Sequence, residues 1–190
     1  MSIDTNYWNE FYNKKQLELI PSDFCLYVMD YLKPTNNEKI KILDAGCGNG
    51  RDSYHLSKKY LVDGMDISYK PDDTELCKFK QDDFTICDKT NYDIIYSRFT
   101  FHSITNEQQE TFIKSIHPGT LLCIETRSDK GKNDNRYYGD DHYRNFTNVK
   151  YLKKILDTNG FEILYIEENN DFAVYNDENP ICIRVICNKV

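Results

Sequence analysis

A glycine-rich turn between an apolar segment and a helical pattern constrains the fold of this chain more than any other feature. The apolar residues lead to Asp44, after which Gly46, Gly48 and Gly50 alternate with other residues. Alternating glycines remove Cβ atoms where a ligand must approach the backbone, and they allow φ values that other residues resist. Such a strand-to-helix turn binds nucleotides or nucleosides at the carboxyl edge of a parallel sheet. The turn therefore predicts an α/β protein with a nucleoside site.

Strand and helix patterns alternate along the rest of the chain. Predicted strands cover residues 40–44, 61–66, 78–81, 92–97, 121–126, 161–167 and 181–187, and predicted helices cover residues 53–59, 106–116 and 149–158. This alternation predicts a Rossmann-like, doubly wound, mostly parallel seven-stranded sheet. Residues 169–180 join the last two strands without a helix, so the last strand is expected to be antiparallel. Two further helical patterns in residues 1–37 predict an N-terminal lid.

Length and composition favour one compact domain over residues 1–190. The hydrophobic content of 39% excludes a disordered chain. The net charge of −7 argues against a duplex DNA binder, although it does not exclude a local basic pocket. No apolar run approaches the ~20 residues that cross a bilayer. Neither a nucleic acid nor a membrane is an expected partner.

The cysteines and the N-terminal residues favour a cytoplasmic protein. The seven cysteines are an odd number without a CxxC pair, which is typical of buried thiols in a reducing compartment. Residues 1–5 lack the basic and apolar regions of a signal peptide. Alanine is rare beside Asn, Lys, Ile and Tyr, which suggests an AT-rich coding sequence such as that of a large DNA virus or an AT-rich bacterium. For a viral protein the compartment would be the host cytoplasm.

Residues 127–146 interrupt the compact pattern. They form a long polar segment without periodicity, yet they carry several aromatic and histidine residues. Loops of this length in a compact domain are usually functional or disordered. We interpret this segment as an acceptor-binding loop, with a simple surface loop as the alternative.

The residues from Asp44 to Gly50 resemble the first motif of the class I S-adenosylmethionine-dependent methyltransferases. The glycines follow GxGxG spacing with an acid two residues before the first, and not the GxGxxG spacing of dinucleotide dehydrogenases. The resemblance extends over nearly the whole chain and implies S-adenosylmethionine as the cofactor. The cofactor-binding residues implied or favoured by position are Asp44, Gly46, Cys47, Gly48, Arg51, Asp66, Ile67, Asp83, Phe84, Ser97 and Arg98.

Two acids in this set have specific implied roles. Asp66 ends the second predicted strand, where the family places the carboxylate that accepts both ribose hydroxyls; two carboxylate oxygens suit two O–H donors. Asp83 follows the third strand, where the resemblance implies an acid for the adenine amino group beside the apolar ring of Phe84. The neighbouring Asp82 is the alternative for that role. For Arg98, a structural salt bridge is the alternative to binding the methionine carboxylate or an anionic acceptor.

The acceptor side is expected near the fourth and fifth strands. A histidine can take a proton from an acceptor because it titrates near neutrality, whereas a lone histidine is often structural. The catalytic candidates are His102, His142 and Glu125, and the substrate-binding candidates are Arg127, Tyr143 and Arg144. Asp140, Asp141 and His142 could ligate a divalent ion, but adjacent loop carboxylates are usually solvated, and we expect no metal.

The runs around Arg98, Glu125 and His142 resemble a subset of small methyltransferases associated with sugar and polysaccharide biosynthesis. This resemblance implies O-methylation of a small polar acceptor such as a sugar or nucleotide-sugar, and the arginines suggest an anionic one. Methylation of RNA, protein or a metalloid is the alternative within enzymes. A non-catalytic cofactor-binding partner protein and a nicotinamide oxidoreductase are the alternatives from other classes.

Overall fold

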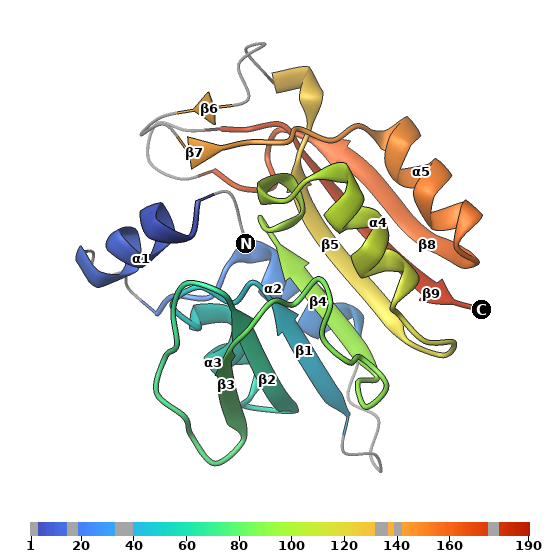
Figure 1. Ribbon diagram of the computed structural model, residues 1–190. Coiled ribbons are helices and arrows are strands. Elements are labelled where there is room, and N and C mark those ends of the chain that lie inside the picture. Colours follow the sequence, from blue (N-terminus) through green and yellow to red (C-terminus); the bar gives the residue numbers. More distant parts are fainter. Residues whose placement is uncertain (1–3, 15–18, 33–39, 132–136, 139–141, 175–178) are drawn as a thin grey trace.

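The computed structural model describes residues 4–14, 19–32, 40–131, 137–138, 142–174 and 179–190. Its centre is a seven-stranded sheet in the order β3-β2-β1-β4-β5-β9-β8 (Figure 1). The strands are β1 (Lys41–Ala45), β2 (Leu61–Asp66), β3 (Cys77–Gln81), β4 (Ile94–Arg98), β5 (Leu121–Arg127), β8 (Phe161–Asn169) and β9 (Cys182–Lys189).

The strand directions confirm the predicted Rossmann-like fold. Strands β1 to β5 pair in parallel, whereas β9 is antiparallel to both of its neighbours, β5 and β8. The chain runs outward from β1 to β3 and then returns to place β4 on the other side of β1. Ligands of open α/β sheets bind outside the carboxyl ends of the strands at such a switch point. The glycine turn leaves β1 at this place.

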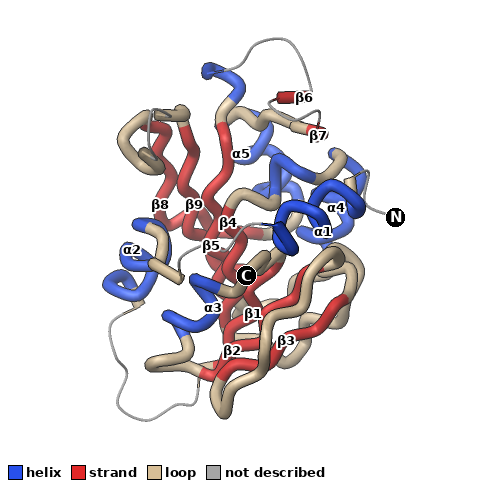
Figure 2. Tube along the Cα trace, turned by 90° about the vertical axis from the view of Figure 1, so that its left-hand side faces the viewer, coloured by secondary structure: helices blue, strands red, loops and turns tan. Residues whose placement is uncertain are grey.

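Helices cover both faces of the sheet (Figures 1 and 2). On one face lie α2 (Asp23–Tyr31) and α3 (Arg51–Leu56), which enclose a buried cluster that includes Phe24, Val28 and Leu56. On the other face lie α4 (Asn106–Lys114) and α5 (Val149–Thr158), with a second cluster that includes Phe112, Leu152 and Leu156. The central strands β1, β2, β4, β5 and β9 are therefore mostly buried, whereas the edge strands β3 and β8 are partly exposed.

Local capping explains several helix boundaries. Ser22 caps α2, and Thr105 forms a capping box with Gln108 at the start of α4. Helix α3 begins earlier and ends earlier than the predicted 53–59, because Gly50 adopts φ +76 directly before Arg51 and the chain turns after Leu56. Helix α4 ends at Lys114 and not at 116, since Ser115 is its C-cap.

Two long connections, residues 67–76 and 127–146, differ in how much secondary structure they contain. Residues 67–76, between β2 and β3, contain no helix. The expected acceptor loop, 127–146, has local structure where it is described: a 3-10 turn (η2, Asp129–Gly131) and the short paired strands β6 (Tyr137–Tyr138) and β7 (His142–Tyr143). Residues 132–136 and 139–141 of this loop lie outside the described residues.

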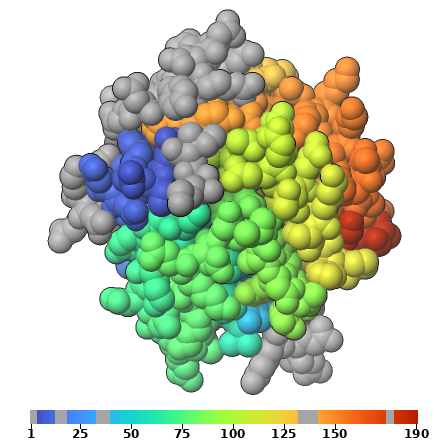
Figure 3. Space-filling model, viewed as in Figure 1, coloured from blue at the N-terminus to red at the C-terminus, as the bar shows by residue number. Residues whose placement is uncertain are grey.

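Helix α1 (Thr5–Lys14) lies at the carboxyl edge of the sheet, beside β7 (Figure 1). The space-filling view shows α1 on the surface between the orange segment that includes β7 and the teal segment that follows β2 (Figure 3). Residues 1–3, 15–18 and 33–37 of the predicted lid lie outside the described residues. No helix in the described part of the chain is long and apolar enough to cross a membrane.

Candidate active site

The glycine turn, residues 46–50, is held at the end of β1 by backbone hydrogen bonds. The N–H groups of Gly46 and Cys47 both donate to the Met65 carbonyl, at 2.7 and 3.1 Å. Gly46, Gly48 and Gly50 all adopt positive φ values, of +80, +53 and +76. Side chains other than glycine resist this region, so the sequence pattern fixes the path of the turn.

Two of the glycines make room for side chains of the protein itself. A Cβ at Gly46 would lie 1.9 Å from Cγ2 of Thr100, and a Cβ at Gly48 would lie 2.3 Å from the Tyr12 hydroxyl. Thr100 is fixed there because its hydroxyl donates to the Ala45 carbonyl at 3.0 Å. The glycines therefore permit close packing of Thr100 and Tyr12 on the turn, which is a reason for glycine that the sequence pattern does not reveal.

Asp66 connects the end of β2 to the glycine turn. Its Oδ2 accepts a hydrogen bond from the Gly48 N–H at 3.0 Å, and its Oδ1 accepts from the N–H and the hydroxyl of Ser68 at 2.9 and 2.6 Å. These donors fix the orientation of the carboxylate at the switch point. Ile67, the next residue, accepts a hydrogen bond from the Gln81 side chain through its carbonyl.

Three further cofactor-binding candidates, Asp44, Cys47 and Arg51, lie in or next to the glycine turn. Asp44 is buried, and its Oδ2 accepts a hydrogen bond from the Ser53 hydroxyl at 2.5 Å. Burial raises the pKa of Asp44 to about 7. Cys47 is buried as well, and burial raises the pKa of its thiol well above the usual value. Arg51 lies at the start of α3, with its Nε 3.9 Å from Asp52.

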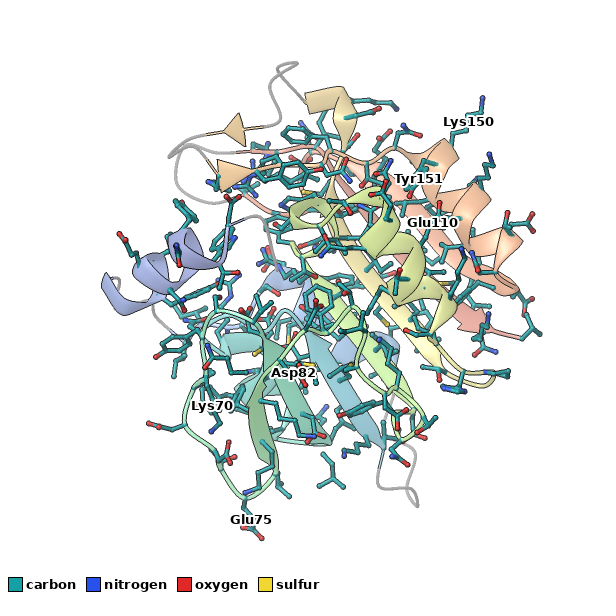
Figure 4. All side chains as sticks on the ribbon, viewed as in Figure 1. Lys70, Glu75, Asp82, Glu110, Lys150 and Tyr151 are labelled. Atoms are coloured by element: carbon teal, nitrogen blue, oxygen red, sulfur yellow. The ribbon has the colours of Figure 1, made fainter. Side chains whose placement is uncertain are left out.

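Asp83 and Phe84 form a turn after β3. Oδ1 of Asp83 accepts from the N–H and the hydroxyl of Thr85 at 2.9 and 2.6 Å, which closes the turn. The Phe84 ring is buried against Phe112 and approaches Gly46. Asp82 is exposed where β3 ends (Figure 4). Both acids are held in this turn, because Oδ1 of Asp82 accepts from the Asp83 N–H at 2.8 Å.

The end of β4 contains a strained residue. Phe99 has φ +59, the single positive φ of a non-glycine residue in the described part of the chain. Its N–H donates to the Glu125 carbonyl at 2.9 Å, and the buried Ser97 hydroxyl is 2.6 Å from that of Thr100. The guanidinium carbons of Arg98 and Arg127 lie 4.2 and 5.6 Å from the centre of the Phe99 ring.

Glu125 is fully buried between two arginines. Its Oε1 accepts from Nε of Arg98 at 2.9 Å, and its Oε2 accepts from Nε of Arg184 at 2.7 Å. Both carboxylate oxygens are therefore engaged, which counts against the predicted catalytic role of Glu125. The structural salt bridge that was the alternative for Arg98 is present.

His102 is buried on the 3-10 turn η1 (Phe101–Ser103) and contacts the acceptor segment, residues 142–146. Its Nε2 is 2.7 Å from Nη1 of Arg144, and its Nδ1 is 3.2 Å from the Thr126 hydroxyl. Both ring nitrogens face donors, because a guanidinium only donates and the Arg127 N–H lies 3.2 Å from Nδ1. Burial, followed by the charges of Arg144 and Arg127, lowers the pKa of His102 well below its usual value. This geometry favours holding Arg144 over taking a proton.

His142 and Tyr143 are placed against α1. The His142 ring stacks on Tyr7 with 4.6 Å between centroids and meets Trp8 edge-on at 5.2 Å. The Tyr143 N–H donates to the Asp4 carboxylate. Asp140 and Asp141, the other members of the considered metal set, lie outside the described residues. Within the described residues, no three His, Cys, Asp or Glu side chains are grouped so that they could hold a metal ion.

The structure thus separates two groups of candidates. The glycine turn, Asp66, Asp83 and Phe84 lie at the ends of β1, β2 and β3, whereas the arginines, Glu125 and His102 lie at the ends of β4 and β5. Sequence reasoning missed Arg184 and Phe99. A lone arginine within the apolar run Ile183–Ile186 was the available signal for Arg184, but only the strand register shows that it faces Glu125.

Comparisons with known proteins agree with this arrangement. The chain matches a family model described as a methyltransferase domain over residues 16–166, and it belongs to that family. Searching the curated proteins gives no match.

Solved structures share the fold at low sequence identity. One is a putative S-adenosylmethionine-dependent methyltransferase from Listeria monocytogenes, with 15% identity, a TM-score of 0.67 and coverage of 88% of this chain and 98% of the other. Another, from Anabaena variabilis, has 17% identity, a TM-score of 0.69 and coverage of 98% and 95%. The 1,6-didemethyltoxoflavin-N1-methyltransferase of Burkholderia thailandensis, solved with S-adenosylhomocysteine, has 15% identity, a TM-score of 0.70 and coverage of 88% and 76%.

The protein therefore has a methyltransferase domain, and S-adenosylmethionine is the cofactor named for solved structures that share its fold. The residues at the glycine turn fit the nucleoside of this cofactor. The Asp66 carboxylate is oriented at the switch point, and Nδ2 of Asn49, a buried donor within the turn, has no hydrogen-bond partner among the described residues. A buried donor without a partner is costly, which is expected at a place completed by a ligand.

Proposed function

We propose that the glycine turn, Asp66 and the Asp83–Phe84 turn hold S-adenosylmethionine, and that the β4–β5 side binds an anionic acceptor. When bound, the cofactor supplies an electrophilic methyl group on a sulfonium. The oriented Asp66 carboxylate would accept the two ribose hydroxyls, and Asp83 and the Phe84 ring would contact adenine. Ser97 and Arg98 would lie beside the methionine end.

The convergence of arginines carries the acceptor part of this proposal. Arg98 and Arg127 flank the Phe99 ring, and Arg144 contacts His102, whose pKa is lowered by burial and then by these arginines. The buried carboxylate of Glu125 is shared by Arg98 and Arg184. Guanidinium groups bind phosphates and carboxylates through paired donors. A phosphorylated or nucleotide-linked sugar, methylated at a hydroxyl, agrees with this chemistry and with the implied link to glycan biosynthesis.

The proton of such a hydroxyl must be removed as the methyl is transferred. We assign this role to His142, because a histidine can take a proton near neutral pH. Its ring belongs to the acceptor segment and is positioned by Tyr7 and Trp8. We further propose a cytoplasmic location, which agrees with seven free cysteines.

The cofactor part is tested by calorimetry with S-adenosylhomocysteine. We expect Asp66→Asn to weaken binding by about 10- to 100-fold, because hydrogen bonds to a charged group contribute about 1.5–3 kcal/mol. Asp72→Asn is the matched control, since Asp72 is exposed on the β2–β3 connection. Equal affinities for the two variants would show that Asp66 does not hold the cofactor.

The acceptor part is tested by following S-adenosylhomocysteine release with sugar 1-phosphates and nucleotide-sugars, using the unphosphorylated sugars as controls. Release is expected with the anionic sugars, and it should fall strongly for Arg144→Gln but not for Lys150→Gln. Lys150 is an exposed residue of α5 that projects into solvent (Figure 4). Release with neutral sugars at the same rate would refute the anionic acceptor.

A further inference from the structure

The Tyr12 hydroxyl is in an unusual position for a tyrosine of a surface helix. It reaches from α1 to the glycine turn, where a Cβ at Gly48 would lie 2.3 Å from the Tyr12 hydroxyl oxygen. The Tyr12 ring packs on Tyr69, which follows the Asp66–Ser68 turn, with 5.5 Å between centroids. Tyr12 therefore lies next to Gly48, whose N–H donates to Asp66.

This hydroxyl has no hydrogen-bond partner among the residues that the structure describes. The side chain is only partly exposed, and burial followed by the charge of Asp66 raises the pKa of Tyr12. The hydroxyl consequently stays protonated and can donate a hydrogen bond. A tyrosine hydroxyl without a partner in the protein can donate this hydrogen bond to a bound ligand.

From this geometry we infer that Tyr12 is a cofactor-binding residue, which donates its hydroxyl hydrogen bond to the cofactor bound over Gly48. The inference rests on the proposed placement of the cofactor at the glycine turn. It makes α1 part of the binding site and not only a cover over it.

The same helix also contacts the acceptor segment. Trp8 lies 6.0 Å from Tyr12 in a stacked arrangement and 5.2 Å from His142. Helix α1 thus contacts both the proposed cofactor site, through Tyr12, and the candidate base His142, through Trp8. Trp8 is the single tryptophan of the chain, so tryptophan fluorescence reports directly on its surroundings between Tyr12 and His142.

The test is the affinity of Tyr12→Phe for S-adenosylhomocysteine, measured by calorimetry and by titration of Trp8 fluorescence. We expect binding about 3- to 10-fold weaker than in the wild type, the value for one lost neutral hydrogen bond. Tyr31→Phe is the matched control, because Tyr31 is an exposed tyrosine of α2. Its affinity should equal that of the wild type.

A thermal melt without ligand separates binding from a structural role. The Tyr12 hydroxyl has no partner among the described residues, so Tyr12→Phe should melt at the wild-type temperature. A lower melting temperature, or unchanged affinity in a protein whose binding is still weakened by Asp66→Asn, would overturn the inference while the cofactor placement stands. If Asp66→Asn also binds normally, the placement of the cofactor itself is wrong.

Discussion

The two halves of the carboxyl edge are held together by different interactions. In the glycine half, formed by the ends of β1, β2 and β3, backbone N–H groups make the decisive contacts, such as those of Gly46 with Met65 and of Gly48 with Asp66. In the arginine half, formed by β4, β5, β9 and the acceptor segment, charged side chains do so, with Glu125 between Arg98 and Arg184. A backbone site suits a constant ligand, whereas a side-chain site can be changed by substitution.

The largest expected effect is loss of the buried charge in the arginine half. Glu125→Gln would leave Arg98 and Arg184 facing a neutral amide, and we expect the free energy of unfolding to fall by about 3–5 kcal/mol. Glu110→Gln is the control, because Glu110 forms an exposed pair with Lys114 at 3.3 Å and should cost at most about 0.5 kcal/mol. Urea denaturation measures both. Similar values would mean that the arginine half does not depend on its central carboxylate.

In the glycine half, a single methyl group is expected to have the next largest effect. Gly46 and Gly119 have similar φ values, +80 and +87, but a Cβ at Gly119 would meet nothing within 4 Å. Gly119→Ala should therefore lower the free energy of unfolding only through the strain of a left-handed backbone, by about 1–2 kcal/mol. Gly46→Ala adds the clash with Thr100, about 1–3 kcal/mol more. Thr100→Ser removes the Cγ2 atom and should recover part of that difference in denaturation experiments; no recovery would assign the loss to another contact.

The smallest effect is a pH dependence with opposite signs in the two halves. The lowered pKa of His102 means that unfolded chains bind a proton below about 6.5 which the folded protein does not, so stability from His102 is lost as the pH falls. The Asp44 pKa, raised to about 7, has the opposite consequence. The folded protein holds that proton, so stability from Asp44 is present at low pH and is lost as the pH rises through about 7.

Each slope is limited to about 1.4 kcal/mol per pH unit for one proton. We expect His102→Gln to reduce the loss of stability between pH 6.5 and lower values, and Asp44→Asn to increase it, in melts at a series of pH values. Parallel curves for the two variants would show that these groups do not determine the pH response.

Local spacing explains why the glycine half could be predicted. Asp44, Gly46 and Gly48 are close in sequence, and Asp66 is the end of the next strand, so the order of strands and turns already places them together. The antiparallel β9 followed from the short connection before it, residues 169–180.

Long-range contacts explain what could not be predicted. Arg184 is 59 residues from Glu125 in the sequence. Tyr12 belongs to α1, yet its hydroxyl contacts the glycine turn at Gly48. Their meeting depends on strand register and on the docking of α1, which no local pattern encodes. His102 shows the same limit, because its residue type suggested a base, whereas burial beside Arg144 decides its protonation state.

The position of β9 has a consequence for co-translational folding. This strand is synthesised after β8, yet it lies between β5 and β8 in the finished sheet. Until β9 emerges, β8 has no sheet neighbour and the Glu125 carboxylate lacks one of its two arginines. We therefore expect the nascent chain to complete the parallel strands early and to remain open on its β5 side, exposing an unpaired edge to chaperones until β9 is inserted.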